Sequence, residues 1–150
     1  MYSYTQEVAS QLNGLLMKNY DAEKGYQTAA ENVDSDVLTN LFERKAKERK
    51  KFGNELKKEI RLFGRLPQDN GSSLGTIHRA WMDTKAFFSL DNDKSILEEA
   101  IRGEKASIKE YNEVINSKEH LPKSTSEMLK SQRNSIIDDT VLIKKLEEIK

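Results

Sequence analysis

Apolar residues recur at alternating steps of four and three along most of the chain, the spacing of helices that pack on one face. The first run covers residues 8–33 and the second residues 38–63. A third run covers residues 97–115 and a fourth residues 129–146. No stretch shows the strict alternation of a half-buried strand. The pattern therefore predicts four long helices and an all-α fold.

Capping residues indicate where the helices begin and end. Ser35 and Asp36 precede the second run, and both residue types commonly cap a helix N-terminus. Gly64 follows the same run and is suited to a helix C-terminus. Ser124 or Thr125 is expected to cap the last helix.

A connection of residues 64–91 separates the second and third runs and is far longer than the two to eight residues usual between neighbouring bundle helices. Residues 68–75 have the composition of a loop, and residues 76–89 are predicted to form a short helix. A connection of this length can return along the bundle. We therefore expect two helical hairpins joined by one long crossover, within a single domain of residues 1–150.

The seam positions identify the core. Ten residues are expected to be mostly buried: Leu12, Leu15, Tyr26, Phe52, Leu56, Leu97, Ile108, Tyr111, Ile136 and Ile143.

Polar residues interrupt every seam near its midpoint. They are Asn19 in the first helix, Arg49 in the second, Glu104 in the third, and Gln132 and Asp139 in the last. The midpoints of bundle helices of similar length lie at one height. We therefore predict a polar layer in the middle of the bundle.

Carboxylates at this height, Glu48, Glu104 and Asp139, are candidate metal ligands, because divalent cations such as iron or manganese bind anionic oxygens. Against a metal, Arg49 adds a fixed positive charge to the seam. A lone buried charge is costly, so Arg49 is expected to pair with Glu104 or Asp139. This interpretation favours an ion-pair layer without a cofactor, and a di-metal centre is the alternative.

The histidines do not fit a di-iron protein. That class carries Glu-x-x-His on two helices. His78 and His120 are the only histidines, and Gly75 and Ser117 stand three positions before them.

Three motifs in order resemble a bacterial ferritin-like family of unknown function that is distantly similar to bacterioferritins. They are GYQTAA at residues 25–30, HRAW at residues 78–81 and RGE at residues 102–104. The resemblance implies a ferritin-like four-helix bundle that is cytoplasmic and stress-associated, with no established reaction. Asn19 stands about where the first-helix glutamate of ferritins would be, which argues against ferroxidase activity.

The crossover motif contributes His78, Arg79 and Trp81, all on the predicted short helix. These residues are expected to dock that helix on the bundle, with the Trp81 ring in the core. A small binding site that includes His78 and Trp81 is the alternative.

Residues 44–51 contain six basic residues in eight, and such a cluster can contact nucleic-acid phosphates. Glu48 interrupts the cluster, no aromatic residue lies in it, and the helical period distributes its side chains around the helix. We interpret it as a solvated face. DNA binding by Arg44 to Lys51 is a further alternative.

Composition limits the remaining function classes. Twenty-five basic and 25 acidic residues give a formal charge of zero, and the absence of cysteine excludes disulfides, thiolate metal sites and a cysteine nucleophile. No signal peptide or membrane-spanning run is apparent, so a cytoplasmic location is expected. No catalytic signature was found, which favours a non-catalytic protein.

Tyr20, Phe87 and Phe88 are expected to lie outside the seams and to mark a surface for self-association or a protein partner.

Overall fold

Four helices make up nearly all of the computed structural model, which describes residues 4–68, 92–117 and 120–149. They are α1 (Tyr4–Asn32), α2 (Asp36–Leu62), α4 (Asp93–Ile115) and α5 (Lys123–Ile149). These ranges contain no strand, which confirms the all-α prediction. None of their helices is both long enough and apolar enough to span a lipid bilayer. The predicted short helix at residues 76–89, with His78, Arg79, Trp81, Phe87 and Phe88, lies outside the described residues.

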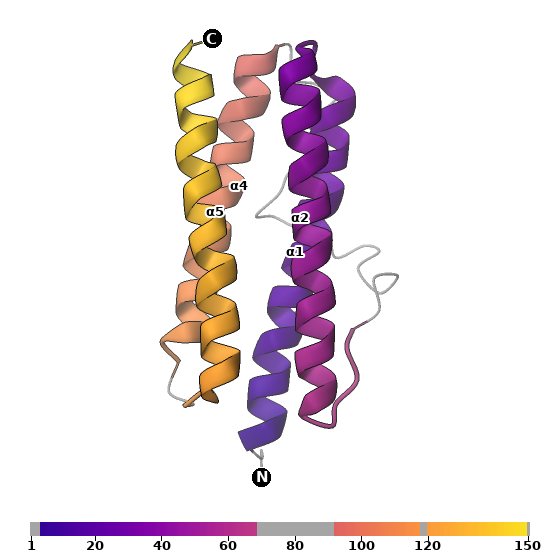
Figure 1. Cartoon of the computed structure of the whole chain (residues 1–150), viewed down its shortest axis with the longest axis vertical. Coiled ribbons are helices and arrows are strands. Elements are labelled where there is room, and N and C mark those ends of the chain that lie inside the picture. The colour runs from indigo at the N-terminus through magenta and orange to yellow at the C-terminus, as the bar shows by residue number, and fades with distance from the viewer. Residues whose placement is uncertain (1–3, 69–91, 118–119, 150) are drawn as a thin grey trace.

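The helices form two antiparallel hairpins, α1 with α2 and α4 with α5 (Figure 1). Helices α2 and α4 run in the same direction, so the end of α2 and the start of α4 lie at opposite ends of the bundle (Figure 1). A helix of 27 residues such as α2 is about 40 Å long. The end of α2 and the start of α4 are therefore separated by about the length of the bundle, in agreement with the two hairpins expected from the sequence.

Both ends of α2 follow from local sequence. At the N-terminus the Leu38 amide donates to the Ser35 side chain, which confirms the predicted cap. At the C-terminus the Gly64 and Arg65 amides donate to the carbonyls of Arg61 and Ile60. This is the Schellman pattern, and it requires the left-handed conformation that Gly64 adopts at φ 74°.

The predicted cap of α5 was wrong. The helix begins at Lys123, and the Ser126 amide already donates to the Pro122 carbonyl at 2.9 Å. The Thr125 side chain is buried and its hydroxyl donates to Glu59 on α2. A contact between helices therefore takes the hydroxyl that was expected to cap the helix.

The core is divided into two apolar clusters. One contains the second half of α1 with the starts of α2 and α4 and Ile143 of α5. The other contains the first half of α1 with the second half of α2, Tyr111 of α4, and Leu129 and Ile136 of α5. Of the ten predicted core residues, Ile108 is half-buried and the other nine are buried.

Tyr20 was predicted to lie outside the seams, and this prediction was wrong. The residue is buried inside the bundle and is only 5% exposed. Gly53 of α2 faces the Tyr20 ring, and a Cβ built on it would lie 4.0 Å from that ring, which is an ordinary contact distance. The Tyr20 hydroxyl donates to the Gln68 carbonyl at 3.0 Å, and the Lys57 ammonium lies 5.3 Å from the ring centre. Tyr20 is therefore part of the α1–α2 contact.

Candidate functional site

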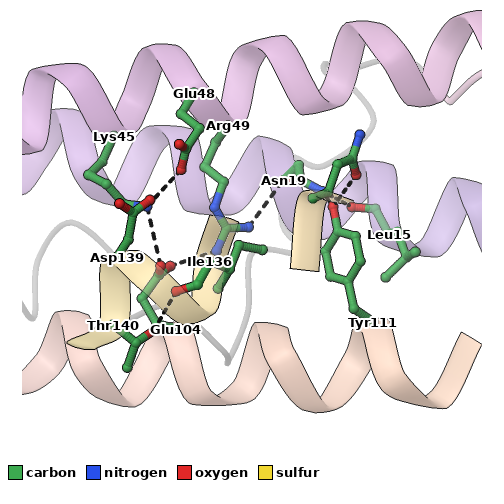
Figure 2. Close-up of polar contacts among 11 residues, drawn as sticks. Leu15, Asn19, Lys45, Glu48, Arg49, Glu104, Tyr111, Ile136, Asp139 and Thr140 are labelled. Atoms are coloured by element: carbon green, nitrogen blue, oxygen red, sulfur yellow. Dashed lines mark hydrogen bonds and ion pairs between the residues drawn. The ribbon is translucent and has the colours of Figure 1, made fainter. Parts of the chain in front are cut away.

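A layer of polar side chains from all four helices separates the two apolar clusters (Figure 2). At its centre the Arg49 guanidinium of α2 donates to Glu104 of α4 at 2.6 Å and to the Asn19 side-chain oxygen of α1 at 3.0 Å. The side chains of Arg49 and Glu104 are completely buried. Of the two partners predicted for Arg49, the structure selects Glu104.

Lys45 is the second buried cation of the layer, and its side chain is 0% exposed. Its ammonium lies 2.8 Å from Glu48 and 3.4 Å from Glu104, and it also bonds Asp139 of α5. The three carboxylates proposed from the sequence as metal ligands therefore do come together, but around the ammonium of Lys45 (Figure 2).

The layer continues on the other side of Arg49 as a chain of side-chain hydrogen bonds. The Asn19 amide donates to the Tyr111 hydroxyl at 2.9 Å, and that hydroxyl donates to Gln132 at 2.6 Å. The Gln132 amide donates to Glu55 at 2.9 Å. These bonds satisfy groups that would be costly to bury unpaired. All five residues of the predicted layer therefore lie in the middle part of the bundle. Asn19, Arg49, Glu104 and Gln132 form one network completed by Tyr111, and Asp139 is joined to it through Lys45. Because Gln132 and Asp139 are seven residues apart on α5, the network extends about 10.5 Å along the helix axis.

The sequence interpretation missed Lys45 because it treated this residue as part of a solvated basic cluster. The spacing of buried positions along α2 indicates that Lys45 faces the core. Counting back from Phe52 by steps of three and four gives Arg49, Lys45 and Phe42, and all four are buried. A lysine at a seam position requires a buried acidic partner, and that partner is supplied by other helices.

The basic cluster of residues 44–51 is split between the core and the surface. Lys45 and Arg49 point inward, whereas the other four basic residues are exposed: Arg44, Lys47, Lys50 and Lys51. The distribution around the helix that was predicted from the period is confirmed. The cluster offers a partner four cations rather than six.

Aromatic rings cover the charged end of the layer. The Tyr26 ring stacks on Phe42 with centroids 5.7 Å apart, and the Lys45 ammonium lies 5.4 Å from the Tyr26 ring centre. Burial, and then the negative charge of Glu104, raise the pKa of Tyr26 well above its ordinary value. Burial likewise raises the pKa of Tyr111 to about 12. Both phenols are therefore neutral at physiological pH, and the layer contains no phenolate.

The two outer carboxylates of the Lys45 cluster are shifted in opposite directions. Partial burial, and then a hydrogen bond to Asp139, raise the pKa of Glu48. Burial acts to raise the pKa of Asp139 too, but the hydrogen bond with Glu48 and the positive charge of Lys45 outweigh it and lower that pKa. Glu48 therefore takes up a proton more easily than Asp139, so the Lys45 ammonium lies between carboxylates of unequal acidity.

These shifts predict how stability depends on pH. The folded protein holds a proton on Glu48 at a pH where the unfolded chain has lost it, so this residue contributes stability that is lost as pH rises through its raised pKa. We expect Glu48→Gln, which mimics the protonated form, to remove this decline. Urea unfolding at several pH values from 4 to 8 measures it. The exposed Glu43→Gln on the same helix is the control, and equal pH dependence of both variants would contradict the expectation.

The residues present do not fit a di-metal centre. Two buried cations lie within 3.4 Å of the carboxylates that a metal would need. A divalent ion would have to displace the Lys45 ammonium and would then share Glu104 with the guanidinium of Arg49. In residues 4–68, 92–117 and 120–149, no group of three His, Cys, Asp or Glu side chains is arranged to hold a metal ion.

Comparison with known proteins identifies the fold. The model of a family described as Domain of unknown function (DUF2383) matches residues 7–117. Comparison with curated proteins gave no match. A dodecameric thioferritin, the bacterioferritin-related protein from Bacteroides fragilis, is 19% identical with a TM-score of 0.83, over 97% of this chain and 87% of that one.

A second similar structure is described as ferritin-like, diiron-carboxylate proteins from Bacillus anthracis strain Ames. It is 22% identical with a TM-score of 0.69, over 99% of both chains. At these identities the likeness concerns the fold, and it confirms the ferritin-like four-helix bundle expected from the sequence motifs.

Proposed function

This chain belongs to the DUF2383 family of ferritin-like bundles, and we propose that it is a non-catalytic member in which a structural ion-pair layer takes the place of a di-metal centre. The observation that carries the proposal is the Lys45 ammonium, which lies among Glu48, Glu104 and Asp139. Arg49 adds a second positive charge beside Glu104. The side chains of Lys45 and Arg49 thus supply the positive charge that pairs with the central carboxylates of the bundle.

Electrostatics support this assignment. Three carboxylates face the two buried cations and the more exposed Arg44, which lies 3.8 Å from Asp139. This positive charge opposes the binding of iron or manganese among the carboxylates. Asn19, which supplies a neutral amide from α1, donates to Tyr111 and accepts from Arg49. Its side chain is thereby committed to the hydrogen-bond network.

Metal content tests the proposal directly. Protein purified without a chelator is expected to contain much less than one iron or manganese ion per chain by elemental analysis. About two ions per chain, the content of a di-metal carboxylate centre, would contradict the ion-pair proposal and support the alternative of a metal-binding oxidoreductase. The same preparation treated with EDTA and dialysed provides the baseline.

A bundle without a reaction centre has to act through its surface, and we propose self-association or a protein partner as that action. The Bacteroides fragilis protein of similar fold is described as dodecameric, which supports assembly as a property of such bundles. Light scattering over a range of concentrations is expected to give a mass above one chain. Nucleic acid is not the proposed partner, because two cations of the 44–51 cluster are buried. Retardation of duplex DNA that disappears with added salt would support that alternative.

A stress-associated role in the cytoplasm completes the proposal and rests on the sequence motifs. The transcript that encodes this protein is expected to become more abundant when the cells are exposed to oxidative or osmotic stress. An unchanged transcript level under both treatments would contradict this part of the proposal and leave the ion-pair layer unaffected.

A further inference from the structure

The outer face of α5 carries exposed apolar side chains. Val141 is 52% exposed and Leu142 is 40% exposed, and Ile149 near the end of the helix is 79% exposed. Helix α5 lies at the edge of the bundle, on the side away from α1 (Figure 1). Its buried face, with Ile136, Asp139 and Ile143, points the other way into the bundle.

An acidic and a basic residue lie on either side of Val141 and Leu142 along α5. Asp138 and Lys145 are both exposed and stand seven residues apart. Seven residues are close to two helical turns, so both lie on the same side of α5, about 10.5 Å apart along its axis. Neither residue forms an ion pair in the part of the chain that the structure describes.

This charge pattern is complementary to itself. A two-fold axis perpendicular to α5, midway between Val141 and Leu142, places Asp138 of one copy level with Lys145 of a second copy. The same symmetry repeats the pair in the opposite sense, as in any isologous contact. Val141 then meets Val141 of the second copy across the axis, and Leu142 meets its own equivalent.

We infer that a second copy of this chain docks antiparallel on α5, with Val141 and Leu142 at the centre and an Asp138–Lys145 pair at each end. This inference deepens the proposed self-association and rests on it. A single pair of helices presents a small area compared with the about 1,200 Å² that a stable interface buries. The contact is therefore expected to be reversible, and the fraction of the protein present as the dimer is expected to rise with protein concentration.

A cysteine-free chain allows a sharp test. In the docked pair the two Val141 residues are offset from each other by about 1.5 Å along the helix axes. The two Ile137 residues are offset by about 13.5 Å along the same axes. A disulfide requires Cα atoms less than about 7 Å apart. Under mild oxidation Val141→Cys should therefore form a disulfide-linked dimer. Ile137→Cys, on the same helix and 37% exposed, is the matched control and should stay mostly monomeric.

Charge reversal provides a second readout. In the Val141→Cys background, Asp138→Lys should cause a loss of the linked dimer by placing like charges opposite one another. Adding Lys145→Asp should restore it, because the pair is then re-formed with its charges exchanged. A purely collisional disulfide would respond to neither change.

The outcomes separate this inference from the proposed function. If the unaltered protein self-associates by light scattering but Val141→Cys and Ile137→Cys are linked to the same extent, the α5 contact is wrong and self-association by another surface remains. If the unaltered protein is a strict monomer at every concentration, both the α5 contact and the proposed self-association are wrong. Selective linking of Val141→Cys with charge-reversal rescue supports the inference.

Discussion

Replacing Glu104 with glutamine will lower the free energy of unfolding by about 3–5 kcal/mol, the cost of leaving buried charges without their partner. The Glu104 carboxylate lies 2.6 Å from Arg49 and 3.4 Å from Lys45, and all three side chains are completely buried. The amide of glutamine fills the same space but carries no negative charge. Arg49 then loses its carboxylate partner, while Lys45 keeps its contacts with Glu48 and Asp139. Urea unfolding at pH 7 measures the loss.

The matched control is Glu99→Gln on the same helix. Glu99 pairs with Arg102, whose side chain is 46% exposed, and an exposed pair of this kind contributes about 0–1 kcal/mol. If Glu104→Gln proves no more destabilising than Glu99→Gln, the ion-pair layer does not stabilise the bundle in the way that its geometry indicates.

Replacing Lys45 with alanine will also destabilise the fold by about 3–5 kcal/mol, and this variant should acquire a response to metal that the unaltered protein lacks. Removal of the ammonium leaves Glu48, Glu104 and Asp139 around the space that it occupied. Carboxylates are suitable ligands for a divalent cation. Manganese at about a hundred times its dissociation constant should then return about 2.7 kcal/mol of stability.

Unfolding with EDTA and with manganese distinguishes the variants. Lys47→Ala, at an exposed position two residues further along α2, should be nearly neutral in both buffers. Equal stabilisation of the unaltered protein and of Lys45→Ala by manganese would show that the ammonium does not exclude the metal. Such a result would contradict the proposed role of Lys45.

Much of the fold is predictable from the sequence because helix periodicity and caps are local. Ser35 and Gly64 bound α2 through hydrogen bonds to residues within five positions, so their types alone indicate the ends. The seam spacing likewise predicts which face of each helix is buried, and nine of the ten expected core residues are buried. The same argument explains the failure at Thr125, because its hydroxyl bonds Glu59, 66 positions away.

The polar layer shows where this local information ends. Periodicity placed Asn19, Arg49, Glu104, Gln132 and Asp139 in the middle part of the bundle, but it left two partners open for Arg49. That choice depends on the axial offset and rotation of α2 relative to α4 and α5. These are set by the packing of whole helix faces rather than by the sequence of any one helix.

Lys45 and Tyr20 illustrate the same division. Each occupies a helix position whose environment comes from another helix. Lys45 is buried because Glu104 and Asp139 approach it, and Tyr20 because it packs against α2. The sequence alone determined the four long helices, both ends of α2 and the presence of polar residues in mid-helix, since these depend on hydrogen bonds and periodicity within one segment. Only the tertiary structure decided that the candidate metal ligands surround an ammonium, because that contact joins three helices.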